Sequence, residues 1–179
     1  MILTCFLLGS LVFGVPGVKA YEFLGYEWSY SDIRDLTYKV DSNCDHYAYI
    51  VDTSYYASSS WNNIVSSGCP NLNEVTSGDL VYITDYEDPY GDLAYTYVWH
   101  SGGYYYSSII YINDYKIDVT YYTDNLHFQF VVCHEMGHTL GLAHESGSVV
   151  MYPYDSVYLD LGIYQPTTDD ENGIVALYS

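Results

Sequence analysis

Basic side chains are almost absent from this sequence of 179 residues, which has 4 Lys and Arg residues against 23 Asp and Glu and a formal net charge of −19. Such a chain would repel the phosphates of a nucleic acid and the headgroups of an anionic membrane. We therefore expect neither nucleic acid nor membrane as a partner. The charge suits a solvated protein, which we expect to be a monomer. It could also steer basic substrates toward the protein, and simple solubility is the alternative interpretation.

Long apolar runs are also missing, with one exception at the start of the chain. Residues 2–15 are almost wholly apolar but too few to span a bilayer as a stable helix. Residues 18–20 read Val-Lys-Ala, the small-x-small pattern that signal peptidase reads. We interpret residues 1–20 as a signal peptide, although no basic residue precedes the apolar run. A buried N-terminal strand is the alternative. The prediction is a secreted, extracellular protein whose residues 21–179 form one domain.

Cysteine is scarce, and the positions of its four residues limit disulfide chemistry. Cys5 would leave with the signal peptide, so the remaining thiols could form at most one intramolecular bridge. Cys44 and Cys69 flank a predicted helix and are the natural pair in an oxidising compartment. Cys133 falls on the apolar face of another predicted helix, where we expect a small buried hydrophobe.

Hydrophobic periodicity predicts one sheet packed on helices. Alternating apolar residues bounded by turn residues mark the strands, and apolar stripes at helical spacing mark the helices. The clearest stripe consists of Leu126, Phe130, Cys133, Gly137 and Leu140. The predicted strands are residues 36–40, 79–84, 93–99 and 104–113. The predicted helices run from Asp52 or Thr53 to about residue 67, from Asp124 or Asn125 to Gly141, and from Asp169 to Leu177, with loop from Gly141 to about Pro166.

Residues 134–144, which read HEMGHTLGLAH, carry the strongest chemical signal. Because residues four apart lie above one another on a helix, His134 and His138 present two imidazoles to one point, as a zinc ion requires. Gly141 can end the helix in the left-handed conformation, so that His144 returns to the same metal. Three nitrogen ligands leave a fourth position open for water, which is typical of a catalytic zinc.

Glu135 follows the first of these histidines and can reach a metal-bound water as general base without being a ligand itself. A bare H-E-x-x-H pattern occurs by chance, but its extension by the glycine and the third histidine is specific. The alternative is a set of helix-surface histidines without a metal. His127 lies two turns before His134, about 10 Å along the helix, which is too far to share the metal. His46 and His100 have no ligand-like spacing.

This signature resembles the metzincin clan of zinc endopeptidases, and specifically the matrixins. Residues 148–153 (SVVMYP) look like the family's Met-turn, in which Met151 would form the hydrophobic base under the metal. Residues 169–178 (DDENGIVALY) are similar to the matrixin C-terminal helix, and residues 36–38 look like its first strand. The resemblance implies an α+β fold of the zincin type, with a twisted, mixed five-stranded sheet, a backing helix, an active-site helix and a C-terminal helix. Residues 21–179 would then be the catalytic domain.

The resemblance further implies a zinc-dependent endopeptidase that binds extended substrate along the sheet edge. One Zn²⁺, held by His134, His138 and His144, would bind a water that Glu135 activates to hydrolyse the peptide bond. Two other interpretations stay open. The protein could be a non-catalytic binding protein on the same fold, with its 25 tyrosines forming a glycan- or protein-binding face. It could also be a zinc hydrolase that acts on a non-peptide amide.

The sequence departs from the matrixin pattern in several places. It has no cysteine-switch motif, and we expect no second zinc, because the corresponding segment holds tyrosines and only one histidine, His100. Glu145 stands where matrixins usually carry serine, which is more typical of astacins. Calcium could bind an acidic turn through carboxylate oxygens, although a solvated loop is the simpler interpretation. The carboxylates concerned are those of Asp85, Glu87, Asp88 and Asp92.

Overall fold

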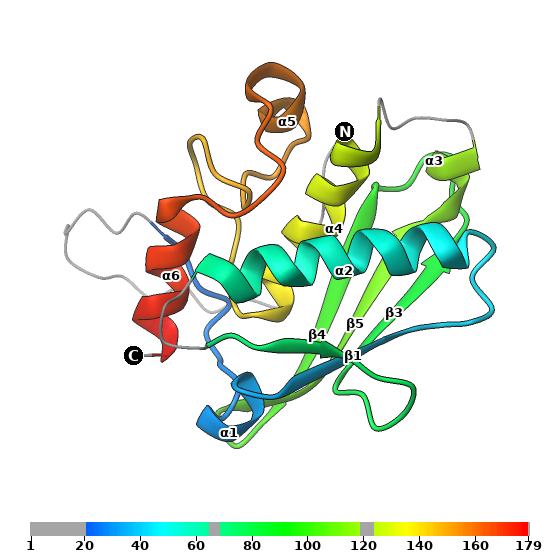
Figure 1. Ribbon diagram of the computed structural model, residues 1–179. Coiled ribbons are helices and arrows are strands. Elements are labelled where there is room, and N and C mark those ends of the chain that lie inside the picture. Colours follow the sequence, from blue (N-terminus) through cyan, green and yellow to red (C-terminus); the bar gives the residue numbers. More distant parts are fainter. Residues whose placement is uncertain (1–20, 65–68, 119–123, 179) are drawn as a thin grey trace.

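One sheet, with the long helices gathered on one side of it, organises the protein (Figure 1). The structure is a computed structural model and describes residues 21–64, 69–118 and 124–178. The predicted signal peptide, residues 1–20, lies outside the described residues. In chain order the elements are α1 (Tyr30–Ile33), β1 (Leu36–Val40), α2 (Tyr47–Ile64), β2 (Leu72–Glu74), β3 (Val81–Tyr86), β4 (Ala94–Ser101), β5 (Tyr104–Asn113), α3 (Asp114–Asp118), α4 (Asn125–Thr139), α5 (Ser156–Leu161) and α6 (Thr168–Tyr178).

The sheet has five strands in the order β2-β1-β3-β5-β4. Strand β4 is antiparallel to β5 and lies at the edge, whereas the other neighbours are parallel. The tight turn from β4 to β5 needs two residues with positive φ, and Gly102 and Gly103 supply values of 61° and 94°. The five strands, with parallel and antiparallel neighbours, confirm the predicted mixed α+β architecture. Each predicted strand is present with its ends shifted by at most two residues, and β2 is an additional short strand.

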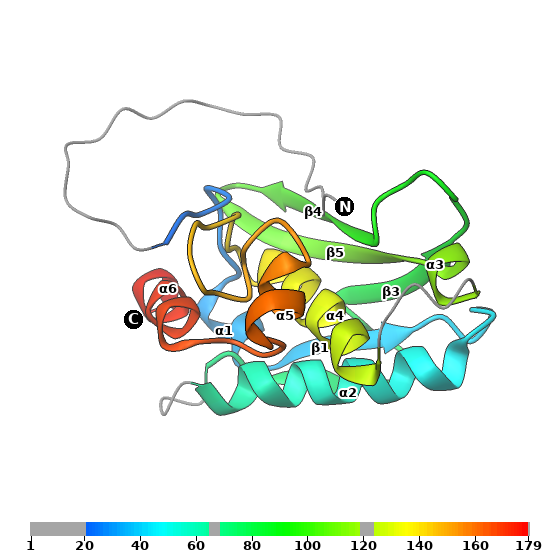
Figure 2. The same ribbon diagram turned by 90° about the horizontal axis from the view of Figure 1, so that it is seen from above.

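Helices α2 and α4 lie on the same side of the sheet (Figure 2). Helix α4 contacts both β4 and β5, while α2 packs against α4 and against β1 and β2. The side chain of Trp61 on α2 is fully buried, and its Nε1 donates a hydrogen bond of 2.9 Å to the carbonyl of Cys133 on α4. Almost every residue of α4 from His127 to Thr139 is buried, as expected for a helix enclosed by the core. Cys133 is buried as predicted, whereas Leu126 at the start of the same stripe is 42% exposed.

The predicted start of the first long helix is wrong, because α2 begins at Tyr47 rather than at Asp52 or Thr53. The side chain of Thr53 does not cap a helix start. Its Oγ1 donates a 2.8 Å hydrogen bond to the carbonyl of Tyr49, the back-bonding of a threonine inside a helix. A side chain that can serve either role therefore gave a false start signal. The predicted end near residue 67 lies outside the described residues.

The predicted disulfide between Cys44 and Cys69 is also wrong, because both are free and buried. They lie near opposite ends of α2, which has 18 residues. At 1.5 Å per residue, a helix of this length separates its ends by about 27 Å. A disulfide requires Cα atoms roughly 4.4–6.8 Å apart. The length of α2 keeps the chain segments at its two ends apart, which explains why Cys44 and Cys69 are not paired.

The face of the sheet opposite α2 and α4 carries many of the tyrosines. The rings of Tyr95 and Tyr111 stack with centroids 4.8 Å apart, and Tyr97 packs edge-on against both at 5.5 and 6.1 Å. Trp99 extends this row along β4, with its ring 6.1 Å from that of Tyr97. The ring of Tyr97 stands nearly perpendicular to the rings of Tyr95 and Tyr111, at 81° and 86°, so these three side chains cover one another rather than forming a flat surface. Part of the tyrosine excess thus packs the outer face of the sheet.

Two features complete the fold. Helix α6 matches the predicted C-terminal helix to within one residue at each end, whereas the short helix α5 lies in a stretch that was predicted to be loop.

Among the described residues, none of the helices combines the length and the apolar character that crossing a bilayer would require.

Candidate metal centre

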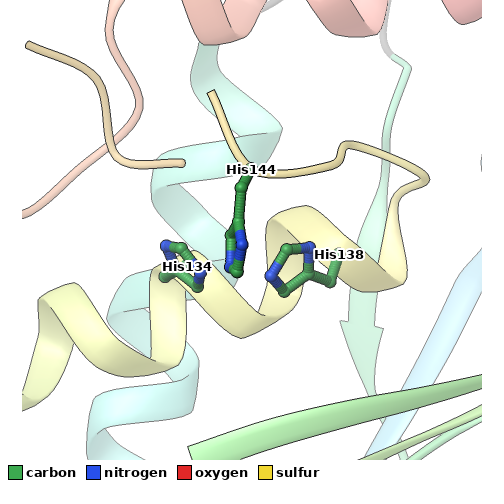
Figure 3. Close-up of side chains that lie close together, drawn as sticks. All are labelled: His134, His138 and His144. Carbon is green, nitrogen blue, oxygen red and sulfur yellow. The ribbon is translucent and has the colours of Figure 1, made fainter. Parts of the chain in front are cut away.

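The helix that carries the first two histidines is fixed at its start by a side-chain cap. Asp124 is the N-cap of α4, and its carboxylate accepts a 2.9 Å hydrogen bond from the backbone N–H of His127. This is one of the two capping residues expected from the sequence. From this start, His134 and His138 fall one turn apart on the side of the helix that faces the following loop (Figure 3).

The chain reverses immediately after α4, and glycine is needed at the reversal. Gly141 has a φ of +100°, a conformation that other residues rarely adopt. A Cβ at this position would also lie only 3.2 Å from the carbonyl of Tyr26 and from the side chain of Leu177. The predicted helix stop is therefore confirmed.

The segment after the reversal is held by the N-terminal part of the described chain. The backbone N–H of Leu24 donates to the carbonyl of Gly141, and the N–H of Ala143 donates to the carbonyl of Glu22, both at 2.9 Å. These two bonds fix the backbone directly before His144. As a result, the third histidine returns to the two histidines of α4.

The three imidazoles point toward one another in Figure 3, and each has a ligating nitrogen within 4.8 Å of the others. The Nε2 atoms of all three have no hydrogen-bond partner among the described residues, although they are buried. The opposite nitrogens of His134 and His138 bond the carbonyls of Val150 and Leu142, each at 2.8 Å. A carbonyl can only accept, so Nδ1 of these rings carries the proton and Nε2 keeps its lone pair.

The protonation states of these rings also suit a metal. Burial lowers the pKa of His138 to about 3, with a further contribution from the nearby His144. Burial likewise lowers the pKa of His134 well below its usual value and lowers that of His144. Neutral imidazoles are the form that binds metal ions. Three converging, buried, unpaired nitrogens thus fit a zinc ion, which is bound by such histidine triads.

Glu135 lies beside this cluster on α4 and is fully buried. One carboxylate oxygen, Oε2, accepts a 2.6 Å hydrogen bond from the Thr96 hydroxyl on β4. The other, Oε1, has no partner among the described residues. Burial raises the pKa of Glu135 to about 8, although the hydrogen bond from Thr96 opposes this shift. A carboxyl group with one anchored and one unpaired oxygen can exchange a proton with a nearby reactant.

The predicted Met-turn lies against the same helix. Met151 is 1% exposed, and a Cβ added to Gly137 of α4 would collide with its sulfur. The carboxylate of Asp170 accepts hydrogen bonds from the N–H groups of Val150 and Met151, at 3.1 and 3.3 Å. Since the carbonyl of Val150 also orients His134, the turn connects α6 to the histidine cluster.

Comparison with known proteins decides the family. The family model described as Matrixin matches residues 74–179, more than half of the chain. This chain is a matrixin. At the level of the family, its function is therefore of the zinc metallopeptidase type, and the triad of His134, His138 and His144 is a group that could hold the metal.

A search of solved structures supports the fold alone. A chain of the structure described as "GM1 bound form of the ECX AB5 holotoxin" matches with a TM-score of 0.58 and 15% sequence identity. The match covers 88% of this chain and 86% of that chain. At this identity the likeness concerns the arrangement of helices and strands and carries no information about activity.

The remaining histidines of this matrixin lie apart from the triad. His127 is buried, with its ring stacked on that of Tyr158 at a centroid distance of 4.9 Å and its Nε2 3.5 Å from the carboxylate of Asp155. His46 bonds Asp114 at 2.6 Å, and the ring of His100 stacks on that of Tyr26 at 3.6 Å. None of these histidines belongs to the triad.

The acidic turn was interpreted from the sequence as a solvated loop, with calcium binding as the alternative. Within the described part of the chain, Glu87 is the one residue of the four considered for calcium that belongs to a group able to hold a cation, together with Asp45 and Asp114. Asp85 and Asp88 accept hydrogen bonds from backbone N–H groups instead. Calcium binding stays a prediction.

Sequence reasoning missed three residues that support the site. Thr96 bonds Glu135, and Asp170 bonds the Met-turn. Trp28 donates a 2.7 Å hydrogen bond from Nε1 to the carbonyl of Thr139. Of these three, only Asp170 has a signal in the local sequence, because it stands three residues after Thr167 in a capping pattern. Its carboxylate accepts hydrogen bonds from the N–H and the hydroxyl of Thr167, at 2.7 and 2.8 Å. Glu145, by contrast, bonds the neighbouring Ser146 through Oε1.

Proposed function

We propose that this matrixin is a secreted zinc-dependent endopeptidase. The observation that carries the proposal is the set of three buried Nε2 atoms without partners, beside a buried carboxyl group with one unpaired oxygen. Orphaned buried polar atoms are costly in a folded protein. A metal ion at the three nitrogens removes that cost, and a proton-accepting carboxylate next to it is what hydrolysis requires.

The ligands in this proposal are His134, His138 and His144. When bound, zinc supplies Lewis acidity, which lowers the pKa of water to ~7 and polarises a peptide carbonyl. Glu135 takes a proton from the attacking water through Oε1 and then delivers it to the departing amine. The carbonyls of Val150 and Leu142 keep two of the imidazoles in the tautomer that presents Nε2.

We propose that the substrate is an extended polypeptide. Strand β4 is an edge strand of the five-stranded sheet and contacts α4, so a peptide strand that added to this edge would run past the histidines. The segment after Met151, which includes Pro153 and Tyr154, would form a wall of the pocket beyond the scissile bond. With 23 acidic residues against 4 basic ones, the chain would favour basic peptides.

Secretion rests on the character of residues 1–20, and a monomeric state without nucleic-acid or membrane partners rests on the charge. Both are part of the proposal. N-terminal sequencing of the secreted chain is expected to begin at Tyr21. A mature chain that retains the apolar segment would contradict the signal-peptide interpretation.

The test of the activity uses purified residues 21–179, a quenched peptide library and the variant Glu135→Gln. This substitution keeps the shape of the side chain but removes the base. We expect cleavage by the wild type, its loss with 1,10-phenanthroline and its recovery with added zinc. Glu135→Gln should bind zinc normally and cleave about 10²–10⁴-fold more slowly.

Two outcomes would redirect the proposal. Zinc binding without cleavage of any peptide would favour a binding protein or a hydrolase of non-peptide amides. Full activity of Glu135→Gln would refute the role of Glu135 as the base.

A further inference from the structure

Thr96 connects the edge strand to the carboxylate of Glu135. It lies on β4, where it pairs with Ile110 of β5, and its side chain is 2% exposed on the face that meets α4. Its hydroxyl oxygen lies 2.6 Å from Oε2 of Glu135 and 3.2 Å from the backbone carbonyl of the same residue. A hydroxyl has one proton to donate, and the shorter of the two distances assigns that proton to the bond with Oε2.

We propose that Thr96 is a positioning residue that fixes the carboxylate of Glu135, anchoring Oε2 so that Oε1 stays free for the reaction. The inference rests on the proposed function, because it assigns a purpose to a bond beside the proposed base. The role proposed for Thr96 is exerted through its hydrogen bond to Glu135.

The need for such an anchor follows from the side chains involved. Glu135 has three rotatable bonds, and burial of its charged form is unfavourable without hydrogen bonds. Threonine is branched at Cβ, so its χ1 is stiff, and a strand holds its backbone in place. Of the two oxygens of Glu135, only Oε2 has a partner among the described residues. One rigid donor thus determines which oxygen of the carboxyl group is left for a proton.

The position of the donor on β4 adds a second consequence. β4 is the strand that would bind an extended peptide, so the substrate and the base are positioned by the same element. Removing the hydroxyl leaves the backbone of β4 unchanged. The effect is therefore expected in the rate of the chemical step rather than in substrate binding. Misplacement of a catalytic group by about 1 Å can lower a rate by roughly a hundredfold.

The test compares Thr96→Val, which removes the hydroxyl at nearly constant volume, with Thr96→Ser, which keeps it. Ser108→Ala is the matched control. Ser108 is a fully buried residue of β5, and its hydroxyl bonds that of Thr139 on α4 at 2.9 Å, so this variant also removes a sheet-to-helix hydroxyl bond but leaves Glu135 alone. Thr96→Ala replaces the valine variant if that variant does not fold.

For Thr96→Val we expect a kcat about ten- to a hundredfold lower, with KM and zinc content unchanged. Thr96→Ser should stay within about threefold of the wild type, and Ser108→Ala should keep its kcat. Crystal structures should show the Glu135 carboxylate displaced in Thr96→Val and retained in Thr96→Ser. An unchanged kcat in Thr96→Val, an equal loss in Thr96→Ser or in Ser108→Ala, or an unmoved carboxylate would each overturn the proposal.

The crystal structures also separate this inference from the proposed function. If the wild-type chain cleaves no peptide, the endopeptidase proposal fails. The position of the Glu135 carboxylate in the valine and serine variants still reports whether Thr96 holds it.

Discussion

Gly137 is the point where α4 touches the Met-turn, and replacing it tests the packing under the histidine cluster. In an unobstructed helix, a change from glycine to alanine stabilises by about 0.5–1 kcal/mol. Here the new Cβ would collide with the sulfur of Met151 and lie 3.0 Å from the Trp61 ring. Both neighbours are buried, at 1% and 0% exposure. Overpacking of a filled core costs about 1–3 kcal/mol, so Gly137→Ala should be destabilising by about 1–2 kcal/mol.

Urea unfolding of the metal-free chain measures this difference without the contribution of bound zinc. For a domain of this size the melting temperature should fall by about 2–8 °C. Repeating the substitution in a Met151→Ala background, where the sulfur is absent, should remove most of the penalty, because the closest contact of the new Cβ is then lost. The reasoning is refuted if Gly137→Ala raises stability by about 1 kcal/mol, as at an open helical position, or if the penalty is equal in both backgrounds.

Three further changes test other parts of the structure. Asp170→Asn should lower the free energy of unfolding by about 1–3 kcal/mol in urea, because the amide cannot accept all four hydrogen bonds that the carboxylate receives; a neutral result would mean that these bonds add nothing. Trp28→Phe should lower the free energy of unfolding by about 1–3 kcal/mol, because the carbonyl of Thr139 loses the donor Nε1 of Trp28. An unchanged melting temperature in thermal unfolding would contradict this prediction. Burial raises the pKa of Cys44 from 9.0 to about 12, so the folded state holds its proton more tightly than the unfolded state. The contribution of this shift to the free energy of unfolding is complete below pH 9 and is lost as the pH rises toward 12, so the free energy of unfolding of Cys44→Ala should fall less than that of the wild type over this range. Iodoacetamide at pH 8 should label Cys44, Cys69 and Cys133 only after unfolding, because all three thiols are buried.

The local parts of the site could be predicted from the sequence because their geometry follows from helix periodicity. The spacing of His134 and His138, the cap at Asp124 and the stop at Gly141 each depend on residues within a few positions. The structure places His144 beside the other two for the reason expected, namely a chain reversal at glycine. These features require no knowledge of distant segments.

The parts that sequence reasoning missed depend on contacts between distant segments. Thr96 bonds a residue 39 positions away, and nothing in its neighbourhood distinguishes it from other strand threonines. Helix α5 lacks a side-chain hydrogen bond at its N-cap, and tertiary contacts such as the 2.6 Å bond from Tyr158 to Asp124 hold it instead. The Cys44–Cys69 prediction failed for a related reason: a spacing along the chain was interpreted without the length of the helix between them.

The most direct test of the metal site is X-ray absorption at the zinc edge on residues 21–179 and on the variant His144→Ala. One zinc per chain is expected, with three imidazole nitrogens at about 2.0–2.1 Å and one oxygen from solvent. In His144→Ala the spectrum should lose one imidazole, and the zinc should bind more weakly. Absence of bound zinc, a sulfur ligand, or a coordination shell unchanged by His144→Ala would contradict the assignment of His134, His138 and His144 as the ligands of a catalytic metal.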